Sequence, residues 1–279
     1  MRQATSRTVP PRRSRSRAVA AWVVAATDPQ RRGGSWWDLS EFALAAFGFL
    51  LYFLVRGAVV DRVDEALANA RAIVDLERAL GIFVEGDMQR WTLGHELWWR
   101  TANFVYFWWD FPLIVGVGVV MFVTRRGCYT FLRDACLISG GIALVMYALI
   151  PVAPPRLVPE LGIVDTLQQF AQLSYQAQSM QPFVNPYAAL PSLHVGWALL
   201  LVVAVFRATG SVAARGASLL VLVAQSVAVV ATGNHFVIDG VVGVVVCVVA
   251  LVVALWLQAT GYPLVRRRLA AWGGVAVDG

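Results

Sequence analysis

The sequence predicts an all-α membrane protein with six transmembrane helices and an outer amphipathic helix. Of its 279 residues, 58% are hydrophobic and only 14% are charged, whereas globular proteins have about half and about a quarter. A soluble core of this size cannot bury so much apolar surface. The mean hydropathy of +0.64 agrees, and six apolar runs approach the length of about 20 helical residues that a bilayer requires.

The six predicted spans are numbered here in chain order. They are 39–60, 101–123, 135–152, 191–206, 214–232 and 236–257. The fourth is the shortest of them. We expect 39–258 to form one membrane domain, with a basic, disordered tail at 1–38 and a second tail at 259–279.

The placement of basic residues predicts the orientation of the spans. All 23 of them are arginine, and 17 acidic residues leave a net charge of +6. Arginines gather in both tails and in the links between spans two and three and between spans four and five. With six spans these four segments share one side, which the positive-inside rule makes cytoplasmic. Anionic lipid head groups explain the basic excess, so we expect a plasma-membrane protein that binds no nucleic acid.

The outer amphipathic helix is predicted between the first two spans. Within 61–100, the apolar residues Val63, Leu67, Ala70 and Val74 recur at helical spacing, with charged residues between them. Such a helix presents one apolar face and lies at the surface of a membrane.

Two features of the composition exclude particular catalytic mechanisms and binding sites. The absence of lysine rules out a Schiff-base mechanism and a Walker-type phosphate site. The three cysteines, Cys128, Cys136 and Cys247, match no metal-binding spacing and fit buried free thiols. We therefore expect no cofactor and no resident metal.

Polar residues gather at the extracytoplasmic ends of the predicted spans. Arg156 follows span three, Ser192 and His194 stand at the start of span four, and His235 and Asp239 stand at the start of span six. Polar groups at membrane depth are costly and mark functional sites. This set therefore contains the candidate site residues.

The spacing within the set suggests specific pairings. His235 and Asp239 lie four apart, so a helix places them on one face, where the carboxylate can accept an imidazole N–H and fix the tautomer. Alternatively, the pair only satisfies two buried polar groups. Pro191 fits the first turn of span four, with Ser192 and His194 just inside the helix. A helix N-terminus favours an anion, although a simple helix cap also explains the proline and serine.

Together these residues suit phosphoryl transfer, which needs a nucleophile, a proton donor and positive charge around the phosphoryl oxygens. His235 would attack phosphorus, with Asp239 orienting its ring. His194 would protonate the leaving alkoxide. Arg156, which alone could be a snorkelling interface residue, would hold phosphoryl oxygens together with the amides near Ser192.

At these residues the chain resembles the type 2 phosphatidic acid phosphatase superfamily of six-span membrane enzymes. The superfamily's second motif, P-S-G-H, appears at 191–194 with leucine in place of glycine. The third motif, S-R-x5-H-x3-D, keeps His235 and Asp239, while Ala228 and Val229 replace its serine and arginine. The resemblance covers roughly 39–257 and implies a catalytic domain at 39–258.

The first motif of that superfamily, K-x6-R-P, cannot exist without lysine, and Arg156 is the closest cationic candidate. The run from Asn185 to Ala198 resembles the inositol phosphorylceramide synthase-like subgroup. This resemblance implies a phosphohistidine intermediate on His235 and a lipid phosphate or phospholipid substrate. The acceptor could be water or an alcohol, so hydrolysis and transfer both stay open.

Four further residues are candidates for substrate binding. Asp110 lies in span two before a proline and could pair with an arginine or a histidine, bind a head group, or only kink the helix. Asn185 and Tyr187 could shape the rim of the pocket or form an Asn-Pro turn. Asn234 could donate to a phosphoryl oxygen or serve as a turn residue.

Two other classes of protein remain as alternatives. A metal-dependent membrane hydrolase would use His194, His235 and Asp239 as ligands. A non-catalytic or transport protein would reuse the scaffold, with broken spans and a midplane site. The clustering of polar residues at helix ends argues against a transporter. The sequence gives no indication of the oligomeric state.

Overall fold

The computed structural model describes residues 62–167 and 185–273, together with 18–20, 22, 24, 39, 41–48, 50 and 51. Two compact units are distinguished, Phe42–Leu255 and a smaller one made of Met1–Glu41 and Trp256–Gly279. Over the described residues every regular element is a helix, and the sole β feature is an isolated bridge between Val152 and Ala188. The prediction of an all-α protein is thus confirmed.

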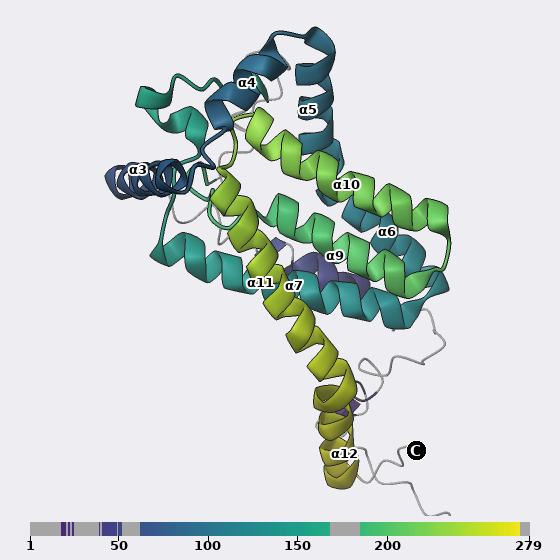
Figure 1. Cartoon of the computed structure of the whole chain (residues 1–279). Coiled ribbons are helices and arrows are strands. Elements are labelled where there is room, and N and C mark those ends of the chain that lie inside the picture. Colours follow the sequence, from purple (N-terminus) through teal and green to yellow (C-terminus); the bar gives the residue numbers. More distant parts are fainter. Residues whose placement is uncertain are drawn as a thin grey trace, which may run out of the picture. The chain divides into compact units, whose positions relative to one another are not determined.

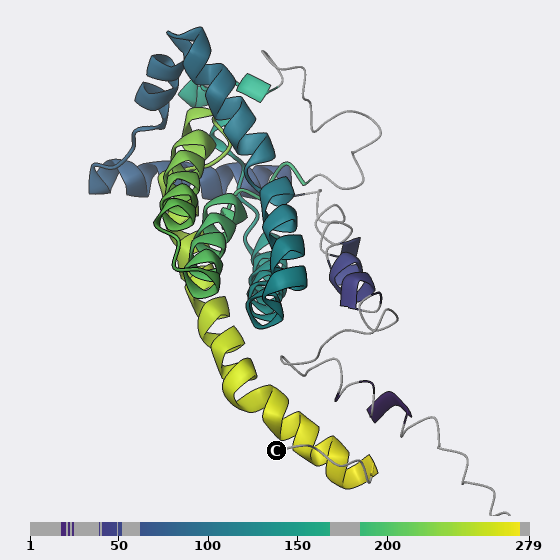
Figure 2. The same ribbon diagram turned by 90° about the vertical axis from the view of Figure 1, so that its right-hand side faces the viewer.

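The larger unit contains the candidate site. Its helices are α3 Val63–Leu80, α4 Glu85–Leu93, α5 Glu96–Trp108, α6 Phe111–Thr124, α7 Arg126–Leu149, the 3-10 turns η1 Pro155–Leu157 and η2 Pro159–Leu161, α9 Leu193–Ala208, α10 Val212–Ala231 and α11 Val237–Trp256. In the smaller unit a π-helical turn, η4 Leu257–Gly261, precedes α12 Tyr262–Gly273. Both views show α9 between α10 and α7 (Figures 1 and 2).

Three of the described helices are long and apolar enough to cross a membrane. They are α7, α10 and the continuous helix Val237–Trp272 that begins with α11. The helices α5 and α6 pass the same test as one span that is bent by 47°, and α9 is a shorter apolar helix. These helices indicate a membrane protein. The count of six spans stays a prediction, because part of the first predicted span, 52–60, lies outside the described residues.

The second predicted span, 101–123, is broken rather than continuous. Helix α5 ends at Trp108, and α6 begins at Phe111 with Pro112 in its first turn. Proline has no backbone N–H, and its ring clashes with the carbonyl four residues earlier, which is that of Trp108. The helix therefore stops and restarts, and Asp110 occupies the break.

The third predicted span begins too late, because α7 starts at Arg126 rather than at 135. Apolar composition misses this first part, which contains Arg133 and Asp134. These two side chains pair at 2.7 Å and are largely buried. Charges that neutralise each other can be accommodated inside a helical bundle, and so the helix extends further than its apolar run.

Helix α3 lies where the apolar spacing predicts a helix. Its buried residues are Ala66, Ala70, Ile73, Val74 and Glu77, whereas Val63 is exposed. Figure 2 shows α3 running crosswise to α11. Its position at a membrane surface stays a prediction.

Two glycines allow α9 and α11 to approach closely. A Cβ atom added at Gly243 would lie 2.1 Å from the Ser192 carbonyl oxygen, and one at Gly196 would lie 2.6 Å from Cys247 Sγ. Larger residues would force the two backbones apart. This close approach brings the N-termini of both helices together.

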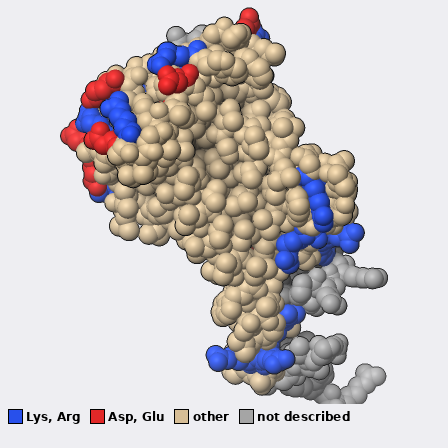
Figure 3. All heavy atoms as spheres, viewed as in Figure 1, with Lys and Arg blue, Asp and Glu red and all other residues tan. Residues whose placement is uncertain are grey.

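The surface of the larger unit is asymmetric in charge. In Figure 3 acidic and basic side chains lie together over α3 and α4, while arginine alone appears at the opposite end, where α9 ends and α10 begins. The surface between these ends carries no charged side chain in this view. The asymmetry follows the arginine pattern of the sequence.

Candidate active site

The two candidate histidines lie next to each other at the start of α9 and α11. Their ring centroids are 5.5 Å apart, and the ring planes are inclined by 56°. The main chain causes this proximity, because Ser192 N donates to the Asp239 carbonyl oxygen at 2.9 Å. The second and third motifs are therefore joined directly.

His235 is held through its Nδ1 atom. This nitrogen lies 2.9 Å from the Ala189 carbonyl oxygen and 3.4 Å from Asp239 Oδ2. A carbonyl oxygen can only accept, so Nδ1 carries the proton, and Nε2 of the neutral ring holds the lone pair. The side chain is only 7% exposed. The sequence predicts Asp239 as the group that fixes the tautomer, but the carbonyl of Ala189 is the nearer acceptor.

Asp239 is fully buried and also holds the first turn of α11. Its Oδ2 atom accepts from the backbone N–H of Phe236 at 2.9 Å. One carboxylate thus contacts both the imidazole and the backbone that follows it. The position of His235 is coupled to the start of α11.

His194 is paired with a different acid. Its Nε2 lies 3.4 Å from Asp110 Oδ2, and its ring stacks on Tyr106 with centroids 4.4 Å apart. The break between α5 and α6 directs Asp110 toward this histidine. The two interpretations of Asp110 are compatible, since it stands at a kink and also meets a histidine.

Ser192 is the residue immediately before α9. Its backbone is extended, and the helix begins at Leu193, so Pro191 precedes the helix instead of lying in its first turn. This corrects the prediction. The Ser192 hydroxyl is buried, has no hydrogen-bond partner among the described residues and does not cap the helix. The first amides of α9 therefore lack a side-chain cap and form a potential anion site.

Arg156 lies beside Asn234, the residue that precedes His235. Its Nε contacts Asp165 Oδ2 at 3.0 Å, and its Nη1 donates to Asn234 Oδ1. Asn234 Nδ2 in turn donates to Thr232 Oγ1 at 2.8 Å. These bonds favour a structural role for Asn234, since its side chain is engaged within the protein on both sides.

Asn185 and Tyr187 shape the connection that leads into α9. Asn185 Oδ1 accepts from Tyr187 N at 2.8 Å, which is a local turn. The backbone of Val152 then makes two hydrogen bonds to this connection. Its N–H donates to the Tyr187 carbonyl at 2.9 Å, and its carbonyl accepts from Ala189 N at 3.2 Å. This bridge fixes the Ala189 carbonyl that holds His235.

Residues 71–253, more than half of the chain, match a family model of the PAP2 superfamily. The chain belongs to the PAP2 superfamily. Members of this superfamily are phosphatases and phosphotransferases, so membership indicates a phosphatase-like function. All of the candidate residues described above lie within the matched region. No curated protein and no solved structure matches the chain significantly.

The serine and arginine positions of the third PAP2 motif are apolar in this chain. Ala228 and Val229 are both buried in α10. The Val229 carbonyl accepts from Asn234 N and His235 N, each at 3.1 Å. These positions support the turn before the histidine but offer no charge to a phosphate, which leaves Arg156 as the arginine near this turn.

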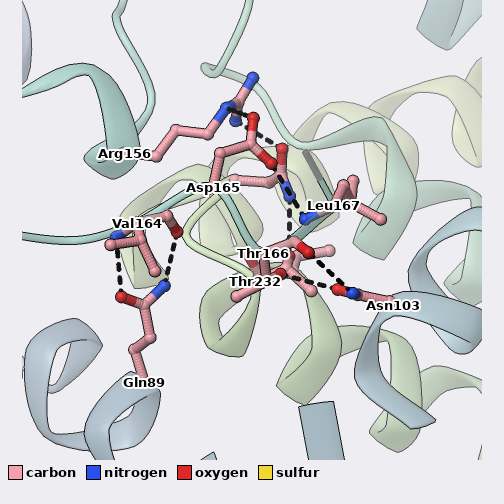
Figure 4. A network of polar contacts seen from close by, with 10 residues as sticks. Gln89, Asn103, Arg156, Val164, Asp165, Thr166, Leu167 and Thr232 are labelled. Atoms are coloured by element: carbon pink, nitrogen blue, oxygen red, sulfur yellow. Dashed lines mark hydrogen bonds and ion pairs between the residues drawn. The ribbon is translucent and has the colours of Figure 1, made fainter. Parts of the chain in front are cut away.

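A polar network that the sequence did not reveal supports Arg156 (Figure 4). Gln89 of α4 exchanges two hydrogen bonds with the main chain of Val164, at 2.8 and 2.9 Å. Asn103 of α5 exchanges two with Thr166, at 3.0 and 2.7 Å. These bonds fix the segment that carries Asp165, and hence the guanidinium. Asn103 could have been recognised from the sequence as a candidate for this network, since it is a polar residue inside a predicted span.

The described residues contain no group of three or more His, Cys, Asp or Glu side chains arranged to hold a metal ion. His194 and His235 each turn one nitrogen toward a different carboxylate. All three cysteines are free thiols. Each histidine is thus held by its own carboxylate.

Proposed function

We propose that this protein is an integral membrane lipid phosphatase or phosphotransferase that works through a phosphohistidine on His235. The observation that carries the proposal is the pair of neighbouring histidines, each beside its own aspartate, at the start of two helices. Phosphoryl transfer through an enzyme nucleophile needs one group to attack and another to move protons. Two differently held imidazoles can divide these tasks.

The reaction takes place in two steps. Nε2 of His235 attacks phosphorus, a P–N bond forms, and the bond to the leaving oxygen breaks while His194 gives that oxygen a proton. Water or an alcohol then attacks the phosphohistidine, and His194 takes the proton back. The P–N bond breaks, and His235 is regenerated. Hydrolysis and transfer differ only in this second acceptor.

The phosphoryl oxygens are held by the amides at the start of α9, the Ser192 hydroxyl and Arg156. Helix N-termini bind anions through their unsatisfied N–H groups and the helix dipole. The planar guanidinium matches phosphate, and its contacts with Asp165 and Asn234 fix its orientation. Asp110 orients His194 in the same way.

An apolar cavity supports a lipid as the substrate. Its volume is about 380 Å³, and it extends along α6 from Phe111, the neighbour of Asp110, to Phe122. A hydrocarbon chain fits such a surface. The lining residues are Phe42, Ala45, Ala46, Phe111, Ile114, Val115, Gly118, Val119, Phe122, Tyr129, Leu132, Arg133 and Cys136.

The proposed topology has six spans in the plasma membrane, both termini in the cytoplasm and the site on the extracytoplasmic face. The arginine-rich end of the larger unit in Figure 3 supports this orientation. The sequence run 185–198 supports placement in the inositol phosphorylceramide synthase-like branch.

A purified-protein assay tests the proposal. Phosphatidic acid, a prenyl diphosphate and phosphatidylinositol are offered in detergent micelles, and released phosphate is compared with newly formed phosphodiester. His235→Ala is expected to abolish turnover, and the matched variant His95→Ala, at an exposed histidine, is expected to keep it. Turnover by a well-folded His235→Ala protein at the wild-type rate would contradict the mechanism.

A further inference from the structure

Two buried glutamates from distant helices contact the start of α11. Glu77 of α3 accepts from the backbone N–H of Ile238 at 2.7 Å, and Glu85 of α4 accepts from that of Val237 at 3.0 Å. Both side chains are fully buried. Neither residue belongs to a sequence motif of the site.

Together with Asp239, these residues form a complete set of acceptors. The three backbone N–H groups that follow His235, at positions 236, 237 and 238, each donate to a different carboxylate. The first amides of a helix have no acceptor within the helix, and usually one capping side chain satisfies one of them. Here α3 and α4 supply acceptors from 161 and 152 residues away.

Burial of these acids needs a reason. An acid removed from water is costly unless its polar atoms are satisfied, yet one oxygen of each glutamate has no hydrogen-bond partner among the described residues. Burial, together with the neighbouring carboxyl of Glu85, raises the pKa of Glu77 above its usual range.

The acids also distinguish the two helix starts. The start of α11 is occupied by carboxylates, whereas α9 has no side-chain cap. A phosphate is repelled from the first and attracted to the second. His235 therefore stands on a turn that is fixed from outside and faces the anion site of the neighbouring helix.

We propose that Glu77 and Glu85 are positioning residues for phosphoryl transfer, which fasten residues 236–238 so that His235 faces a phosphate bound at the start of α9. This inference rests on the proposed function. The glutamates touch neither substrate nor reacting atoms. They act through the backbone that follows the nucleophile.

Substitutions separate positioning from simple stabilisation. Glu77→Gln keeps a carbonyl acceptor for Ile238 N–H, so we expect kcat within about threefold of wild type. Glu77→Ala removes the acceptor, and we expect kcat per folded molecule to fall by about 10- to 100-fold with little change in KM, as for a small misplacement of a reacting group. Glu85→Gln and Glu85→Ala should follow the same pattern.

A second variant covers the case in which Glu77→Ala does not fold. Glu77→Asp keeps the acid but withdraws the acceptor by one methylene, so kcat should also fall. Asp75→Asn, an exposed acid on the same helix, is the control and should behave as wild type. A well-folded Glu77→Asp or Glu77→Ala protein with wild-type kcat would overturn the proposal.

Hydrogen exchange gives a readout that does not depend on turnover. The amides of Val237 and Ile238 should exchange faster in the alanine variants and remain protected in the glutamine variants. Unchanged exchange in both alanine variants would refute the fastening itself. Faster exchange in a protein whose wild type transfers no phosphoryl group would support the fastening and reject the proposed function.

Discussion

The contact between Gly243 and the Ser192 carbonyl offers a sharp test of the site geometry. A Cβ at Gly243 would lie 2.1 Å from that oxygen, whereas ordinary contacts begin at 3.4 Å. In Gly243→Ala the two backbones must therefore separate by about 1.3 Å at this point. The hydrogen bond from Ser192 N to the Asp239 carbonyl, now 2.9 Å, would be lost at such a separation.

The expected effect on catalysis is large because that hydrogen bond joins the two histidine motifs. A misplacement of about 1 Å can cost on the order of 100-fold in rate, so we expect kcat to fall by about 30- to 100-fold. Overpacking should also reduce stability by about 1–3 kcal/mol. The rate is measured as phosphate release or transfer from the lipid substrate, normalised to folded protein.

The matched control is Gly240→Ala, one turn earlier in α11. A Cβ there would meet Val195 Cγ2 at 3.5 Å, which is an ordinary contact. We expect its kcat and thermal stability to remain close to wild type. A folded Gly243→Ala protein with kcat within twofold of wild type would contradict this prediction, because catalysis would then not depend on the close approach of the two motifs.

Three further predictions concern the acids and the arginine. Asp110→Asn should lower kcat for lipid phosphates by about 10-fold, because the group that orients His194 is lost. The loss should be smaller for an aryl phosphate, whose leaving group needs no proton, and equal losses on both substrates would contradict this role. Arg156→Lys should weaken vanadate inhibition and lower kcat/KM by about 10-fold, because lysine lacks the planar guanidinium that contacts Asp165. Unchanged inhibition would exclude Arg156 from the phosphate site. Glu77 has a raised pKa in the folded protein, so it contributes stability that is lost as the pH rises above the ordinary glutamate value of 4.5. The melting temperature should therefore fall over this pH range, and Glu77→Gln should make that fall smaller. An unchanged pH dependence of the melting temperature would contradict a proton on Glu77.

The proximity of the candidate residues could be predicted from the sequence because membrane topology orders helix ends. Ser192, His194, His235 and Asp239 stand at the ends of apolar runs, and the predicted topology places these ends on one side. Once the helices pack, such ends meet. The glycine at position 243, between apolar residues, adds the close approach that brings the two histidines together.

The sequence did not predict the residues that reach the site through contacts between distant segments. Asp165 follows a 3-10 turn, and its contact with Arg156 depends on Gln89 and Asn103 in two other helices. Neither spacing nor hydropathy contains that information. Glu77 did give a signal, since it continues the apolar spacing of α3, and an acid on a buried stripe needs a partner.

The break in span two shows a local signal that hydropathy averages away. Pro112 marks the point at which the helix must restart, and the acid beside it occupies the break. A window long enough to detect a membrane span treats both residues as minor interruptions. The same break directs Asp110 toward His194, so the irregularity has a place in the site.

Trapping of the covalent intermediate tests the phosphohistidine on His235 most directly. The purified protein is mixed briefly with lipid labelled in the phosphoryl group, quenched in alkali and digested, and the labelled peptide is sequenced by mass spectrometry. We expect an acid-labile, alkali-stable phosphoryl group on His235 in wild type and in His95→Ala, and none in His235→Ala. Label on another residue, or full turnover by folded His235→Ala protein, would contradict it.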